Sequence, residues 1–337
     1  MMKKLVCFLA VALSLNKISA QNIETIISDK ISIRAIELYD GKVWYAGSNS
    51  KFGYVDVKNP ENQKQIILSD QKLEFRTLAQ DKNSFIAINV SSPAYFYRIS
   101  KKTLQSEIVN GDNDESAFYD ALHYHNGLFY TFRDPGKSLD LEFMSFVMDK
   151  GVFYGKNFQD YKMLEGEAAF AASNTNIASS RNYLWVATGG QSSRIFRLNL
   201  KTQKFEIFNT PFVQGSSSKG MYSIDFYKDK FGIAVGGDYT KQKENINNIA
   251  TTSDAGKTWQ IQASGNNAGY STCVRIRPGS RGKDIIAIGD QHISLSRDFG
   301  KTWKVLSKEK DFYVGEWIDK NNLVLAGKDR IAKMKVF

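Results

Sequence analysis

Short apolar runs alternate with polar turns along most of the chain. The runs at 43–47, 85–88 and 184–187 are rich in β-branched and aromatic residues, and turns such as Asp40-Gly41 and Asn126-Gly127 lie between such runs. This pattern predicts β-strands joined by tight hairpins. No long stretch has the period of an amphipathic helix. The sequence therefore predicts an all-β protein.

The strand-and-turn groups recur at intervals of roughly 40 to 55 residues, which is typical of one four-stranded propeller blade. Seven such units span 33–57, 75–99, 118–148, 167–208, 221–261, 272–306 and 312–336. We therefore predict a seven-bladed β-propeller, with six or eight blades as the alternatives. Blades share one axis and pack face to face, so residues 21–337 are expected to form a single domain.

The last unit offers three strands where a complete blade has four. An open propeller would leave a long unpaired edge, which folded proteins avoid. The segment 23–27 precedes the first unit and partly alternates apolar and polar residues. We expect it to complete the last blade as its outer strand.

Two hairpins share the pattern Ser or Thr, x, Asp, x, Gly, x, Thr, Trp at 252–259 and 296–303. Asp can accept hydrogen bonds from the turn backbone, Gly allows positive φ, and Trp covers the hairpin with an apolar face. We therefore assign these residues a structural role in folding. The residues concerned are Asp254, Gly256, Trp259, Asp298, Gly300 and Trp303.

The hairpin pattern resembles the Asp-box of BNR repeats, found in sialidases and related propellers. The segments 165–174, 186–190, 236–239 and 251–254 resemble motifs of bacterial BNR/YVTN-like propellers. That group is related to the photosystem II stability/assembly factor. The resemblance implies a propeller fold and, in photosynthetic members, an assembly chaperone with no reaction of its own. Some bacterial relatives bear the label "oxidoreductase", yet no cofactor motif accompanies the resemblance here.

The N-terminus has the pattern of a secretory signal peptide. Lys3 and Lys4 precede an apolar run at 5–15 that is too short to span a bilayer, and Ala20 offers a small residue for cleavage. We expect the mature protein to begin at Gln21 and to be periplasmic or secreted. It then keeps Cys273 alone, so no internal disulfide is expected.

The formal charge of +10 falls to +7 when the three lysines at 3, 4 and 17 leave with the signal. The excess is mostly lysine spread through turns, which indicates a solvated surface, with attraction to an anionic partner as the alternative. No basic run is interleaved with aromatic residues, so nucleic-acid binding is not predicted. No later stretch is apolar enough to cross a membrane, so we expect no integral membrane segment.

Enzyme signatures are weak. A sialidase needs an arginine triad, a tyrosine with a carboxylate partner and an acid/base aspartate, and the usual Arg-Ile-Pro motif is missing from the sequence. The Gly-Lys-Thr tripeptides at 256–258 and 300–302 lack the earlier glycine of a phosphate-binding loop and lie in hairpins. We leave catalysis open and regard it as the less favoured class.

Metal and cofactor sites are not predicted. His123 and His125 point the same way on a strand, but His292 belongs to a distant unit. The acidic loop 112–115 lacks the glycine and final glutamate of a calcium loop, and no dinucleotide fingerprint is present. Cys273 in an apolar strand is expected to be packed in the core.

Alignment of the units brings out one group of candidate binding residues. Arg34, Arg76 and Asp120 each stand nine residues before an aligned residue of the second strand. Consecutive blades should therefore present them at similar positions on their innermost strands, facing the central channel. Such a ring would bind an anionic ligand or form a salt-bridged closure of the channel.

Further candidates come from the later units. Glu167, Arg275 and Glu316 are expected near the same level as the ring, and Asp238 and Tyr239 at a rim where ligands bind, with a turn cap as the alternative for Asp238. The predicted function is an exported, non-enzymatic propeller, expected to be a monomer, that binds a protein or a glycan of the cell envelope. A sialidase-like enzyme or glycan-binding protein is the alternative.

Overall fold

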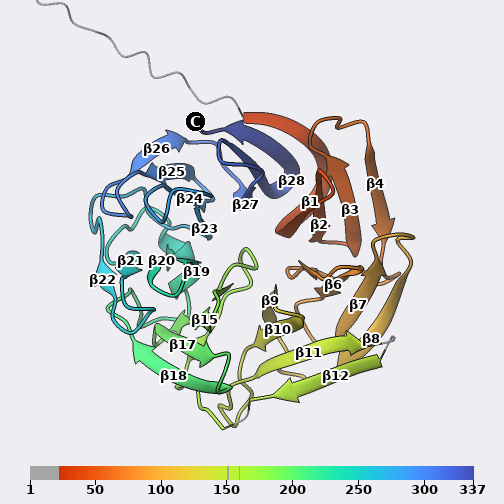
Figure 1. Cartoon of the computed structure of the whole chain (residues 1–337), viewed down its shortest axis with the longest axis horizontal. Coiled ribbons are helices and arrows are strands. Elements are labelled where there is room, and N and C mark those ends of the chain that lie inside the picture. The colour runs from red at the N-terminus through yellow and green to blue at the C-terminus, as the bar shows by residue number, and fades with distance from the viewer. Residues whose placement is uncertain (1–22, 150–151, 159) are drawn as a thin grey trace, which may run out of the picture.

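The protein is a β-propeller whose sheets surround a central axis (Figure 1). The computed structural model describes residues 23–149, 152–158 and 160–337, so the predicted signal segment lies outside the described residues. One sheet contains six strands and includes both chain ends of the described part. Its strands, in hydrogen-bonded order, are β27 (Phe312–Trp317), β28 (Asn322–Lys335), β1 (Ile23–Tyr39), β2 (Lys42–Gly47), β3 (Lys51–Asp56) and β4 (Gln63–Ile67).

Four further sheets have four strands each, paired antiparallel. They are β5 (Ala79–Gln80), β6 (Ser84–Ile88), β7 (Ala94–Ser100) and β8 (Ser106–Asp112); β9 (Tyr119–His125), β10 (Leu128–Arg133), β11 (Phe143–Asp149) and β12 (Val152–Asn157); β14 (Ile177–Ser179), β15 (Tyr183–Ala187), β17 (Arg194–Asn199) and β18 (Lys204–Asn209); and β23 (Cys273–Ile276), β24 (Ile285–Gly289), β25 (His292–Ser296) and β26 (Lys304–Ser307).

The remaining sheet has six strands, two of which are very short. It contains β13 (Glu167–Ala168), β16 (Gly189–Gly190), β19 (Lys219–Tyr227), β20 (Phe231–Asp238), β21 (Ile249–Thr252) and β22 (Gln260–Ile261). A single 3₁₀ turn, η1 (Tyr239–Lys241), follows β20. No helix in the described part of the chain is long and apolar enough to span a bilayer.

The described strands form six sheets, so the propeller has six blades and the prediction of seven is wrong. The difference arises at β1, which is 17 residues long. Its first half pairs with β28 and its second half with β2, so the expected first and seventh units share one sheet. A repeat in the sequence does not reveal that one strand continues through two units.

The N-terminal segment pairs with the last strand, β28, so it supplies the strand that the last unit lacked. Ile23 lies opposite Met334 and Ile27 opposite Ile331, in antiparallel register. Ile26 and Ile27 are buried in the core that β27 and β28 also line. The described chain therefore closes the ring of sheets by joining its beginning to its end.

Burial explains why the sequence shows short apolar runs. Middle strands such as β2 and β24 are covered on both faces by neighbouring sheets, and nearly all of their side chains are buried. Outer strands such as β4 and β12 are largely exposed. Aromatic rings fill the space between sheets, as where Trp44 and Phe85 lie 4.6 Å apart between ring centroids.

The two Asp-Gly turns, 252–259 and 296–303, connect the outermost strands of their sheets. Asp254 accepts hydrogen bonds from the Thr258 amide at 3.0 Å and the Thr258 hydroxyl at 2.7 Å. Asp298 binds Thr302 in the same way, at 2.9 and 2.6 Å. The indole of Trp259 donates to the Gly256 carbonyl at 3.0 Å, so ring and turn fix each other.

The first turn also contacts the preceding sheet. The Ala255 carbonyl accepts hydrogen bonds from the Trp185 indole and from Arg197, both at 2.9 Å. Gly256 has φ of +81°, and a Cβ there would lie 2.9 Å from the Trp185 indole nitrogen. Glycine is therefore required both by the backbone conformation and by the close approach of the neighbouring sheet.

Replacing Asp298 with Ala is expected to lower the free energy of unfolding by about 1–3 kcal/mol, because the backbone amide and hydroxyl of Thr302 lose their acceptor. Urea denaturation measures this change. The matched control is Asp70→Ala at an exposed position, for which we expect a change within about 0.5 kcal/mol. Equal stability of the two variants would contradict a folding role for the turn.

Candidate functional site

Two cavities open along the central axis, at opposite ends of the channel. One, of about 500 Å³, is lined by Arg34, Arg76 and Tyr270. These residues lie near the start of an innermost strand or just before it. The other, of about 470 Å³, is lined by Glu37 and Arg275, farther along such strands. The innermost strands of a propeller run in the same direction along the axis, so early and late residues lie at opposite mouths. We call these the arginine mouth and the carboxylate mouth.

An axial segment, 170–176, lies between the two mouths and touches both. Its Ala172 lines the arginine mouth, whereas Ser173 and Asn174 line the carboxylate mouth. It connects β13 to β14 and reaches the centre of the ring in Figure 1. The early part of this segment belongs to the motif 165–174 that carried the family resemblance.

Hydrogen bonds fix the axial segment to several sheets. Asn174 donates to the Leu78 carbonyl at 2.7 Å and accepts from the Leu122 amide at 2.8 Å. Ser173 donates to the Thr272 carbonyl at 2.6 Å. Arg34 donates to the Ala172 carbonyl at 2.9 Å. The segment thus forms a partition between the two cavities, tied to residues on or next to four innermost strands.

Two arginines, Arg34 and Arg76, supply the positive charge of the arginine mouth. The Arg34 guanidinium lies over the Tyr313 ring, 4.0 Å from its centroid, and its buried Nε has no hydrogen-bond partner among the described residues. Burial and the neighbouring charge of Arg76 lower the pKa of Arg34. Arg76 reaches a carboxylate only at 3.4 Å, from its Nε to Glu74. Both cations are therefore incompletely paired.

Aromatic rings form one wall of the arginine mouth. Phe170 stacks on Tyr222 with ring centroids 3.8 Å apart, and Tyr222 meets Tyr270 edge to face at 4.8 Å. Tyr239 is 51% exposed at the rim, on the 3₁₀ turn. The mouth therefore combines cationic groups with a packed aromatic wall and one exposed ring, that of Tyr239, which suits recognition of another protein.

A pair of carboxyl groups, Asp120 and Asp134, lies near Arg76. Asp120 is fully buried, and Asp134 lines the arginine mouth. Burial and the Asp134 carboxyl raise the pKa of Asp120 well above its usual value, while burial raises the pKa of Asp134 to about 6. Two neighbouring carboxyls in a buried site hold a proton in this way because they cannot both ionise easily.

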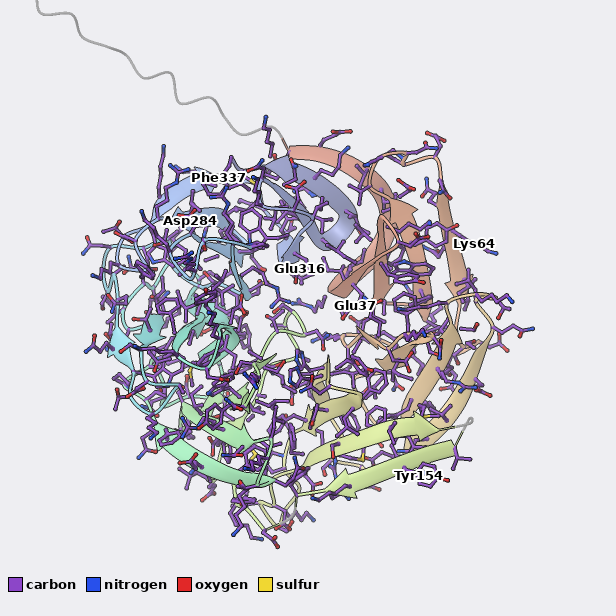
Figure 2. The ribbon with its side chains drawn as sticks, in the orientation of Figure 1. Glu37, Lys64, Tyr154, Asp284, Glu316 and Phe337 are labelled. Atoms are coloured by element: carbon purple, nitrogen blue, oxygen red, sulfur yellow. The ribbon has the colours of Figure 1, made fainter. Side chains whose placement is uncertain are left out.

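The carboxylate mouth contains three acidic residues, Glu37, Asp225 and Glu316. Figure 2 shows Glu37 and Glu316 close to the central opening, on β1 and β27. Glu316 pairs with Arg275, whose Nε lies 2.8 Å from the carboxylate. Glu37 accepts a hydrogen bond of 2.8 Å from the Gln80 amide.

Burial shifts the protonation of this mouth toward neutral groups. It raises the pKa of Glu37 to about 7 and that of Asp225 to about 6, and it lowers the pKa of His123 to about 3. Burial lowers the pKa of Arg275, but Glu316 and the other acidic groups around it together raise the pKa above its usual value, so the guanidinium stays charged. The carboxylate mouth is thus less negative at neutral pH than its composition suggests.

The two neighbouring histidines share one partner. The hydroxyl of Ser179 lies 2.8 Å from His123 Nε2 and 3.0 Å from His125 Nδ1. No group of three metal-ligating side chains occurs within the described ranges. His292 is buried elsewhere, 3.2 Å from the Tyr270 carbonyl.

The structure separates several of the predicted site residues. Arg275 and Glu316 lie at the mouth opposite Arg34, so they do not share the expected level. Glu167 is buried, pairs with Arg194 at 3.0 Å and lines neither cavity. Asp238 caps the 3₁₀ turn by accepting from Thr240 at 2.9 Å. Glu167 departs from the expected level because β13, which carries it, joins the following sheet.

Arg34, Arg76 and Tyr239 do meet, at the arginine mouth, with Asp120 buried next to Arg76. Sequence reasoning missed the carboxyl partner Asp134 and the acid Asp290, whose pKa burial raises. It also missed Glu37 and Asp225. The alternation on β1 was a usable signal, since Glu37 interrupts an apolar strand three residues after Arg34. Asp225 gives the same signal in β19.

Comparisons with solved structures support the propeller fold. The WD40 repeats of RRP9 superpose with a TM-score of 0.65 at 9% identity, covering 95% of this chain and 98% of that one. YCF48 bound to a D1 peptide gives 0.64 at 13% identity, covering 97% and 99%. U3-55K gives 0.64 at 10% identity, covering 94% and 99%. At such low identity these likenesses show the fold alone.

Neither a protein-family model nor a curated protein matches the sequence. YCF48 is a photosystem II assembly factor. Its similarity to this chain therefore agrees, in fold alone, with the resemblance that the sequence motifs indicated.

Proposed function

We propose that this protein is an exported binding scaffold that holds an acidic segment of an envelope protein at its arginine mouth. The observation that carries the proposal is the pair Arg34 and Arg76. Both guanidinium groups line a cavity of about 500 Å³, and Arg34 forms no ion pair with any described residue. Incompletely paired arginines beside aromatic rings are typical of binding surfaces.

The chemistry of the cavity supports a carboxylate-bearing peptide. Guanidinium groups bind carboxylates with charge-assisted hydrogen bonds, and tyrosine rings supply contact area at low entropic cost. Asp290 and the Asp120–Asp134 pair offset part of the cationic charge, so a single carboxylate suits the mouth better than a highly charged polyanion. The peptide-bound state of YCF48 supports peptide binding by a propeller of this fold.

The test is binding of two synthetic twelve-residue peptides, one containing Asp, Glu and Tyr and the other with Asn and Gln in place of the acids. We expect the acidic peptide to bind at least tenfold more tightly at low salt, since ionic strength screens such pairs. Arg76→Gln should weaken its binding about tenfold, equivalent to about 1.4 kcal/mol. Isothermal titration calorimetry measures both.

Arg98→Gln is the matched control, because Arg98 lies on β7 and pairs with Glu107 near the outer edge of its sheet. It should leave peptide affinity unchanged. Equal binding of the acidic and neutral peptides by the unaltered protein would refute the proposal. Export is tested separately by mass spectrometry of the mature N-terminus, expected at Gln21.

A further inference from the structure

We propose that the carboxylate mouth is a second binding site, specific for a neutral carbohydrate. The mouth is a cavity of about 470 Å³ on the axis, which is within the range of small-ligand sites. It lies on the other side of the axial segment from the arginine mouth. The inference does not depend on peptide binding there.

The polar side chains of this mouth come in pairs that orient one another. Glu37 is held by Gln80 at 2.8 Å, Glu316 by Arg275 at 2.8 Å, and His123 by Ser179 at 2.8 Å. Each pair places a hydrogen-bond acceptor beside a donor. A sugar hydroxyl both donates and accepts, so neighbouring hydroxyls match such pairs.

The charge of the mouth argues against ionic ligands. The Arg275 guanidinium neutralises Glu316, and Asp225 accepts hydrogen bonds from the backbone amides of Phe226 and Ile276, so an ionic ligand finds no free counter-charge in these groups. Burial also favours the protonated, neutral form of Glu37. A neutral ligand needs no counter-charge from the site, and a protonated Glu37 can donate a hydrogen bond to it.

The apolar side chains that line the carboxylate mouth also suit a sugar ring. Ile36, Leu38 and Val314 add apolar surface between the polar pairs, and Tyr124 adds a ring. Pyranose rings present apolar C–H faces together with hydroxyl edges, so a mixed wall of this kind suits them. A purely apolar ligand would displace water from these polar pairs without replacing its hydrogen bonds, which is unfavourable.

The test is an array of neutral oligosaccharides built from glucose, galactose, mannose and N-acetylglucosamine, followed by calorimetry with the best binder. Spermidine, lysine and N-acetylneuraminic acid serve as charged competitors. We expect at least one neutral glycan to bind and none of the charged probes to displace it. Failure of every neutral glycan to bind the folded protein, or preferential binding of a charged probe, would overturn the proposal.

Two variants assign the site. Glu37→Gln should weaken glycan binding at least tenfold, because the carboxyl is replaced by an amide of the same shape that presents different donors. Glu24→Gln, on the same strand but with a largely exposed side chain, should leave glycan binding unchanged. Arg76→Gln should also leave it unchanged while it weakens peptide binding. Glycan binding that survives Glu37→Gln, or is lost with Arg76→Gln, would refute this location.

Discussion

A chain that begins at Ser28 should unfold at a lower urea concentration than a chain that begins at Gln21, and it should self-associate. The truncation removes the segment that pairs with β28 and takes Ile26 and Ile27 out of the core. Burial of two such side chains contributes about 3–6 kcal/mol. The loss also leaves the end of β28, from Ile331 to Met334, with an unpaired edge that can join another molecule.

Urea denaturation and size-exclusion chromatography measure the two effects. The control is Glu24→Gln in the longer chain, which removes only the ion pair with Lys333 and should cost less than about 1 kcal/mol. A chain beginning at Ser28 that stays monomeric and melts with the longer chain would show that the closing strand is dispensable.

The buried pair Asp120 and Asp134 should make stability depend on pH in an unusual direction. The folded pKa values of both groups are raised, so their contribution is fully present below the unfolded value near 3.8 and is lost as pH rises through the folded values. Between pH 4 and pH 8 the shift of Asp134 to about 6 alone corresponds to a loss on the order of 3 kcal/mol.

Asp134→Asn removes this titration and keeps the shape of the side chain. The free energy of unfolding of the variant relative to the unaltered protein should therefore rise by on the order of 3 kcal/mol from pH 4 to pH 8. The comparison is made at each pH, so that the histidines with lowered pKa values contribute equally to both proteins. Asp70→Asn is the exposed control. If the free energy of unfolding changed with pH in the same way for Asp134→Asn and the unaltered protein, the raised pKa of Asp134 would be contradicted.

The strands, and much of their grouping into sheets, could be predicted from the sequence. Middle strands buried on both faces appear as apolar runs, and turns such as Asp40-Gly41, with positive φ at both residues, appear as hairpins. The number of blades was not recoverable in the same way. Whether β1 forms one strand or two depends on its pairing with distant partners, and the local pattern is the same in either case.

The candidate site was recoverable only in part, for a related reason. Counting back from the second strands placed Arg34 and Arg76 together, because their units have similar loops. The same counting failed at Glu167, which lies on the short strand β13 and belongs to the next sheet. The partition by residues 170–176 was not foreseeable, because its bonds reach residues that are distant in sequence, such as Leu78 and Thr272.

That partition also determines what the protein can do with two ligands. Because the channel is divided by a bonded segment, a molecule held at one mouth cannot be handed through to the other. With both proposed sites filled, one copy of the protein would carry two different molecules at the same time, facing in opposite directions. It would then act as a spacer that sets the distance and the orientation of one ligand relative to the other.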